Sequence, residues 1–158
     1  MSTHAAAPTD RRTASALKLW VVLSRAYGAI ADRLNARMAK TGLTDTEFGA
    51  LEALYHKGPL LLGELQRSIL VSSGGITYVV DRLERQGLVE RRPCSTDRRA
   101  RYAALTPKGE RLMEEIFPGH AEQVRLALGG LNEEEKQHAT TLLRKLGTYA
   151  AEGAGREP

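Results

Sequence analysis

Apolar side chains recur at alternating spacings of three and four residues between positions 13 and 39, which predicts a long helix with a coiled-coil-type seam. The seam consists of Leu17, Trp20, Ser24, Tyr27, Ala31, Leu34 and Met38. A second apolar stripe beside it consists of Leu19, Leu23, Ala26 and Ile30. Because this helix is apolar over a wide arc, we expect it to pack against more than one neighbour, and a second copy of the chain is one candidate.

A second helix is predicted to begin after Thr44, because Thr44 and Glu47 have the spacing of a capping box, in which each side chain bonds to the backbone of the other residue. It should end before Gly58-Pro59, since neither residue continues a helix. Its apolar stripe consists of Phe48, Leu51, Leu54 and Tyr55.

The next segment predicts a helix-turn-helix. A short helix over residues 62–69 is followed by a turn at 71–73 and by a helix that Ser73 can cap and Gly87 can end. The apolar positions expected in the core are Leu62, Leu65 and Ile69 in the first helix and Ile76, Val79, Val80 and Leu83 in the second.

Two short strands are predicted over residues 88–92 and 101–105, joined by the turn-rich segment 93–97. Together they form a hairpin directly after the helix-turn-helix. This order suits a reader of DNA, in which a helix enters a groove and a basic hairpin contacts the backbone or the neighbouring groove.

The remaining chain predicts two more amphipathic helices. Thr106 caps the first, which Pro107 starts, and Pro118-Gly119 should kink or interrupt it. The second begins at the pair Asn132 and Glu135. Their apolar stripes need partners, so we expect the first, fifth and sixth helices to join two chains into a homodimer.

The sequence therefore predicts a mainly α protein with a small β-hairpin wing, in which a winged helix-turn-helix domain is flanked by N- and C-terminal dimerisation helices. The expected boundaries are a disordered leader at 1–12, the N-terminal dimerisation helix at 13–42, the winged helix-turn-helix region at 43–108, the C-terminal dimerisation helices at 109–150 and a disordered tail at 151–158.

Composition agrees with one ordinary domain: the chain has 158 residues, of which 42% are hydrophobic and 27% charged. No apolar run is long enough to span a membrane, and residues 1–10 lack the pattern of a signal peptide, so we expect a cytoplasmic protein without a membrane partner. The single cysteine, Cys94, cannot form a disulfide within the chain, which fits a reducing compartment.

The basic charge is localised. Residues 1–109 hold 17 Lys and Arg against 10 Asp and Glu, whereas residues 110–158 hold 6 against 9. Seven arginines and four acids lie within residues 81–101. This concentration favours a double-stranded DNA partner, and a merely solvated surface is the alternative.

The outward face of the fourth helix is the first candidate surface for DNA contact. Gly74 and Gly75 in its first turn cost roughly 1 kcal/mol each relative to alanine, a penalty that close approach to DNA would explain, as would a tight helix crossing. The backbone there can donate to phosphate, and polar side chains can reach base edges. The candidate residues are Ser72, Ser73, Gly74, Gly75, Thr77, Tyr78 and Arg82.

The hairpin is the second candidate surface. Arg98 and Arg99 near its tip could enter a minor groove, with Arg101 behind them. An acid among arginines would repel phosphate, so we expect Asp97, or Asp81 on the fourth helix, to orient a neighbouring arginine through a bidentate pair. Ordinary surface pairing is the alternative.

These residues resemble the MarR family of winged helix-turn-helix regulators over roughly residues 15–148. The resemblance is carried by Gly58-Pro59-Leu60, Gly63-Glu64-Leu65, Ser73 to Thr77, Asp81 to Glu84, Gly87-Leu88-Val89, Asp97-Arg98-Arg99 and Leu105-Thr106-Pro107-Lys108-Gly109. It implies an obligate homodimer on a pseudo-palindromic operator, with residues 73–82 as the recognition helix and Arg99 at the minor groove. The run from Ile76 to Asp81 also resembles a branch with quinone-responsive or other aromatic-responsive members.

The resemblance further implies regulation by a small molecule, so we expect a repressor that an aromatic or phenolic effector releases. A pocket would lie where the dimer helices meet the reader. The aromatic candidates for it are Trp20, Tyr27, Phe48, Tyr55 and His56, whose helical spacing is also that of core residues.

Three alternatives stay open. Nearby arginines would lower the pKa of Cys94 and favour a redox-responsive regulator, although a harmless loop thiol predicts the same residue. A winged-helix module can also contact protein or RNA. An enzyme is not expected, since neither a phosphate loop nor a nucleophile elbow is present in the sequence, and no cofactor or metal is expected.

Overall fold

A computed structural model describes residues 10–69 and 73–153. The first helix, α1, spans Arg11–Met38 and confirms the predicted long helix, but it begins two residues before the predicted start. The reason is Asp10, whose carboxylate accepts hydrogen bonds from the backbone N–H groups of Arg12 at 2.7 Å and Thr13 at 3.1 Å and so caps the helix. The expected leader is therefore too long by residues 10–12, and residues 1–9 lie outside the described part.

The helix-turn-helix follows a short 3-10 turn, η1 (Ala39–Thr41). α2 spans Asp45–Lys57, and both bonds of the predicted capping box are present at its start. α3 spans Leu62–Ile69 and α4 spans Ser73–Arg85. The predicted core stripe of α4 is buried, with Ile76, Val79, Val80 and Leu83 at most 6% exposed. The turn expected at Val71 and Ser72 lies outside the described residues.

A three-stranded antiparallel sheet forms the wing. β2 (Val89–Pro93) pairs with β3 (Arg101–Leu105), with Arg91 opposite Ala103, which confirms the predicted hairpin. A third strand that the sequence did not predict, β1 (Leu60–Leu61), pairs with the other edge of β3. The spatial order is β1-β3-β2, so β3 is the central strand and ties the start of α3 to the wing.

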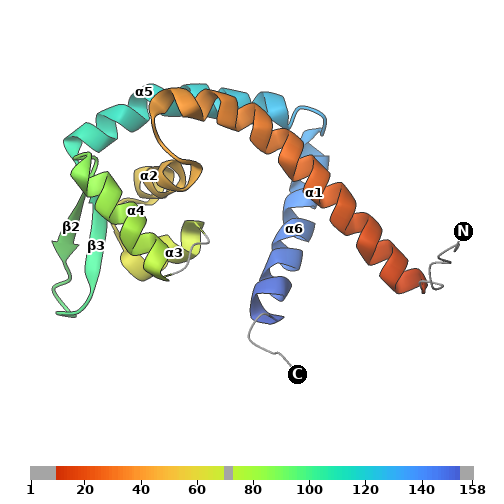
Figure 1. The fold of residues 1–158 in the computed structure, drawn as a ribbon, viewed down its shortest axis with the longest axis horizontal. Coiled ribbons are helices and arrows are strands. Elements are labelled where there is room, and N and C mark those ends of the chain that lie inside the picture. The colour runs from red at the N-terminus through yellow and green to blue at the C-terminus, as the bar shows by residue number, and fades with distance from the viewer. Residues whose placement is uncertain (1–9, 70–72, 154–158) are drawn as a thin grey trace, which may run out of the picture.

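Two further helices complete the chain. α5 spans Pro107–Ala127 and α6 spans Glu133–Gly153, three residues beyond the expected end of the dimerisation helices. The interruption expected at Pro118 is absent, and α5 passes over the winged helix-turn-helix as one continuous, curved helix (Figure 1). Pro118 and Glu114, whose carbonyl loses its helical donor, are both exposed, so water can satisfy that carbonyl.

The core lies between α2, α3, α4, the sheet and the first half of α5. α1 and α6 extend away from it (Figure 1) and carry large apolar side chains that are exposed in the single chain. Leu17 is 56% exposed, Trp20 66%, Leu142 55% and Tyr149 77%. In the part of the chain that the structure describes, no helix is both long and apolar enough to cross a bilayer.

Candidate nucleic-acid interface

The outward face of α4 presents polar and aromatic groups opposite its buried stripe. Tyr78 is 59% exposed and Thr77 is exposed as well, whereas Gly75 is half-buried. Ser73 and Gly74 fall in the first turn of the helix, and Ser72 lies outside the described residues. The geometry therefore brings Thr77 and Tyr78 to the face that the sequence assigned to base recognition, and it leaves their DNA contacts a proposal.

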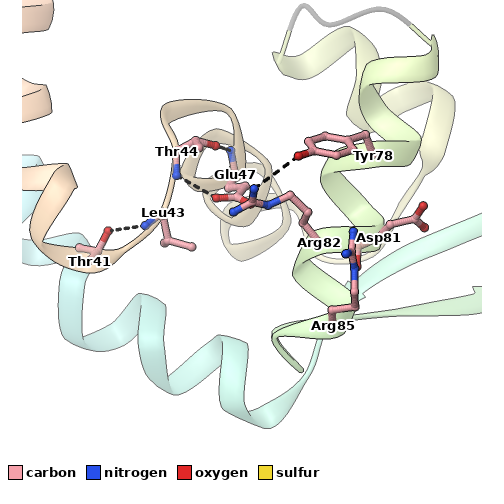
Figure 2. A network of polar contacts seen from close by, with 8 residues as sticks. All are labelled: Thr41, Leu43, Thr44, Glu47, Tyr78, Asp81, Arg82 and Arg85. Carbon is pink, nitrogen blue, oxygen red and sulfur yellow. Dashed lines mark hydrogen bonds and ion pairs between the residues drawn. The ribbon is translucent and has the colours of Figure 1, made fainter.

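Arg82, another candidate for DNA contact, is paired with an acid of a different helix. Its Nε atom lies 2.6 Å from Oε1 of Glu47, a residue of α2 that is 1% exposed (Figure 2). The approach is ionic rather than a well-aligned hydrogen bond, since Oε1 has no partner of hydrogen-bond geometry among the described atoms. The capping-box spacing predicts only the first contact of Glu47, and the contact with Arg82 was not predicted.

Arg82 also reaches along its own helix to Tyr78. One terminal guanidinium nitrogen donates to the Tyr78 hydroxyl at 3.4 Å, and the guanidinium carbon lies 5.9 Å from the centre of the tyrosine ring. The hydrogen bond with Tyr78 and then the attraction of Glu47 raise the pKa of Arg82 above its ordinary value. One arginine thus connects a buried carboxylate with an exposed ring.

Asp81 contacts an arginine of the wing, but through one hydrogen bond rather than the predicted bidentate pair. Arg91 of β2 donates to Asp81 at 2.7 Å and also pairs with Glu84, and the Glu84 carboxylate accepts the Arg91 backbone N–H at 3.0 Å. Two acids of α4 therefore hold the wing against the helix. Arg91 is half-buried and was not among the predicted DNA contacts.

At the wing tip, Arg98 and Arg99 are exposed, as expected for side chains that probe a groove. Asp97 acts differently from the prediction: its carboxylate accepts the Arg99 backbone N–H at 2.8 Å and so shapes the turn rather than a guanidinium. The Arg101 guanidinium donates to the carbonyl oxygens of Arg98 and Ala100 at 2.8 and 2.9 Å. Arg101 therefore braces the loop that carries the two exposed arginines.

Cys94 is half-buried beside this loop, and its sulfur lies 3.3 Å from the hydroxyl oxygen of Thr96. The Thr96 hydroxyl, followed by the backbone N–H groups of Thr96 and Asp97, lowers the pKa of Cys94 below its ordinary value. The expected direction is present, but hydrogen bonds cause it rather than the neighbouring arginines.

A cavity of about 610 Å³ lies between α1, η1, α2 and α5, where the sequence placed an effector pocket. Of the five aromatic candidates, Phe48 lines it, with its ring centre 4.4 Å from that of His120. The charged groups around the cavity are Arg33, Lys40 and Glu115. His120 was not predicted, because its neighbours on other helices are not visible in the sequence.

The other aromatic candidates lie elsewhere. Tyr55 and His56 pack on Phe117, with ring centres 5.7 and 4.7 Å from its own. Tyr27 and His56 line a separate hollow of about 450 Å³ between α1, α2 and α3. Trp20 is exposed on α1. The candidates therefore do not form one site. Within residues 10–69 and 73–153, no cluster of three metal-ligating side chains occurs.

Comparison with known proteins agrees with this architecture. A protein-family model, the MarR family, matches residues 41–100. The HTH-type transcriptional regulator MhqR of Bacillus subtilis (strain 168) is 46% identical over 138 residues, which cover 87% of the chain and 95% of MhqR.

Two solved structures add to this. One is BpsR of Bordetella bronchiseptica, solved to explain the regulation of its DNA binding by 6-hydroxynicotinic acid. It superposes with a TM-score of 0.71 at 31% identity, covering 80% of the chain and 90% of BpsR. The other is Sco3205, a MarR family transcriptional regulator from Streptomyces coelicolor, in complex with DNA. It has a TM-score of 0.78 at 25% identity, covering 90% and 91% of the two chains.

Proposed function

Because the chain belongs to the MarR family of winged helix-turn-helix transcriptional regulators, we propose that it is a cytoplasmic, dimeric repressor that leaves its operator when a small aromatic effector binds. Membership in this family also confirms that the chain is a regulator and not an enzyme. The observation that carries the proposal is the arrangement of α4 and the wing. The exposed face of α4 and the arginine-bearing wing are held together by the ion pairs of Arg91 with Asp81 and Glu84.

The DNA-contacting surface combines two kinds of group. Thr77 and Tyr78 on α4 face outward and would read base edges in the major groove. Arg98 and Arg99 on the wing would reach a minor groove, where the negative potential favours guanidinium groups. Arg91 pairs with two acids of α4 and so fixes the orientation of the wing relative to that helix.

The exposed apolar faces of α1 and α6 support the proposal that two chains assemble through these helices. A soluble protein seldom leaves large side chains such as Leu17, Trp20 and Leu142 in water over two helices. A two-fold dimer built on them would place the recognition helices about 34 Å apart, the spacing of successive major grooves on one side of the duplex. Such a dimer fits a pseudo-palindromic operator.

The cavity between α1, α2 and α5 is the proposed effector site. It joins an aromatic pair, Phe48 and His120, with two cations, Arg33 and Lys40, against one acid, Glu115. This lining suits a small aromatic acid or phenolate. BpsR, whose DNA binding 6-hydroxynicotinic acid regulates, makes this compound a reasonable first ligand to test. A ligand between a dimer helix and the reader can change the spacing of the two recognition helices.

Footprinting on the DNA that flanks the protein's own gene, with and without 6-hydroxynicotinic acid and simple phenols, tests the proposal. We expect a two-fold-symmetric footprint that one of these compounds removes, and lower transcription from that DNA in vitro when the protein is bound. His120→Ala should raise the compound concentration needed for release about tenfold, whereas His56→Ala, outside this cavity, should not. A footprint that every compound leaves intact would contradict the effector part, and raised transcription would contradict repression.

A redox-responsive regulator is the second candidate, because the lowered pKa of Cys94 favours the reactive thiolate. Mild peroxide should then abolish DNA binding in the native chain and spare it in Cys94→Ser. Equal binding before and after peroxide would leave Cys94 as an unreactive loop residue.

A further inference from the structure

We propose that Glu47, buried in α2 and out of reach of DNA, is a positioning residue for sequence recognition: it holds Arg82 beside Tyr78 and so fixes what α4 presents to the major groove. This inference rests on the proposed function, specifically on α4 lying in that groove. It assigns to an interior carboxylate a part in base preference, which the sequence pattern gave only to exposed residues.

The two oxygens of Glu47 have separate tasks. Oε2 accepts the backbone N–H of Thr44 at 2.8 Å and closes the capping box of α2. Oε1 faces the Arg82 Nε atom at 2.6 Å and lacks a hydrogen-bond partner of good geometry among the described atoms. Since a buried carboxylate is costly without a counter-charge, Arg82 is drawn toward the core and held there (Figure 2).

Held in that place, Arg82 becomes a support for Tyr78. Its terminal nitrogen donates to the tyrosine hydroxyl, and its plane stays within cation–π distance of the ring. Tyr78 is mostly exposed and would otherwise exchange rotamers freely. The contact series Glu47, Arg82, Tyr78 therefore leads from the interior of one helix to the reading face of another.

The pair also withholds a positive charge from the backbone of DNA. Arg82 is 38% exposed and neutralised by a nearby carboxylate, in contrast to Arg98 and Arg99 at the wing tip. Releasing Arg82 would add a phosphate-seeking cation that carries no sequence information. Loss of the Glu47 charge should consequently lower the affinity for the preferred sequence and raise the affinity for unrelated DNA. A purely structural ion pair would not produce this result.

Glu47→Gln separates the two tasks, because glutamine can still close a capping box but carries no charge. The probes are the duplex that the native protein enriches from a randomised pool and a shuffled duplex of equal length. We expect the dissociation constant on the shuffled duplex, divided by that on the enriched duplex, to fall about tenfold. The salt dependence on the shuffled duplex should steepen by about one unit for each recognition helix that gains a phosphate contact.

The matched control is Glu52→Gln, which makes the same charge change on the same helix and should leave the ratio and the slope as in the native chain. Arg82→Lys provides a second route if Glu47→Gln does not fold. Lysine keeps the charge opposite Glu47 but lacks the planar guanidinium whose separate nitrogens reach Glu47 and Tyr78, so its support of Tyr78 should be weaker. We expect changed base preference with an unchanged salt slope.

An unchanged ratio and preference in a folded Glu47→Gln or Arg82→Lys protein would overturn this inference while leaving the proposed function intact. An equal response of Glu47→Gln and Glu52→Gln would do so too, since net charge alone would then explain it. If the native protein enriched no sequence at all, the proposed function would fail, and this inference with it.

Discussion

Gly109, in the first turn of α5, lies against the carbonyl oxygen of Leu88 so closely that no β-carbon fits between them. That carbonyl is itself fixed, because it accepts the backbone N–H of Thr106 at 3.1 Å. Gly109→Ala should lower the free energy of unfolding by about 1–3 kcal/mol, as expected for an overpacked site. Urea unfolding followed by circular dichroism, at a fixed protein concentration, measures the change.

Gly63→Ala is the control for this substitution. Gly63 lies in α3, and the nearest atom to a β-carbon there is an Arg67 nitrogen at 3.7 Å, an ordinary contact. Alanine should leave stability unchanged or raise it by about 0.5–1 kcal/mol. Equal free energies of unfolding for the two variants would show that the backbone around Leu88 can shift to accommodate a β-carbon at position 109 without loss of stability.

Arg99→Ala should weaken binding to specific and shuffled duplexes alike and reduce the salt slope by about one for each wing, because an exposed guanidinium would be lost from the DNA backbone or minor groove. Fluorescence anisotropy at several salt concentrations measures both quantities. Arg111→Ala, an exposed cation of α5, is the comparison. Identical slopes for Arg99→Ala and the native chain would remove the wing from the proposed interface.

Leu17→Glu combined with Leu142→Glu should raise the dissociation constant of the dimer roughly a hundredfold or more, since each carboxylate would have to be buried without a counter-charge. Sedimentation equilibrium gives the constant. Ser15→Glu with Gln137→Glu places the same charges at exposed polar positions of α1 and α6 and should leave assembly unchanged. A dimer that survives the leucine substitutions would place the subunit contact elsewhere.

Thr96→Val should raise the pKa of Cys94 toward its ordinary value, because the hydroxyl contact that lowers it most is removed. Thiolate would then form at higher pH, so the midpoint of the pH profile of iodoacetamide alkylation should move upward and the rate at neutral pH should fall. Ser95→Ala, the neighbouring substitution, should keep the native profile. A common profile for all three proteins would mean that Thr96 does not influence the thiol.

The elements that local patterns define were predicted well, and those that depend on distant partners were not. The capping box of Thr44 and Glu47 follows from a spacing of three, and the structure contains it. The second contact of Glu47 depends on Arg82, which another helix brings near, and no local pattern reveals it. The same holds for His120, which reaches Phe48 only because α5 crosses α2.

Two further differences concern β1 and Pro118. β1 contains only Leu60–Leu61, too short for an alternating pattern, and it exists because β3 offers an unpaired edge. Proline in the interior of a helix usually kinks or breaks it, yet α5 continues through Pro118, where both Pro118 and Glu114 are exposed and water can reach the backbone.

β3 is paired on both edges, to β1 before the helix-turn-helix begins and to β2 after it ends. The sheet thus ties both ends of the helix-turn-helix to one strand, and we expect the segment between them to move as one unit. We expect an effector to tilt each winged helix-turn-helix as a rigid body. The distance between the two recognition helices would then change, while the surface that meets each half-site stays constant.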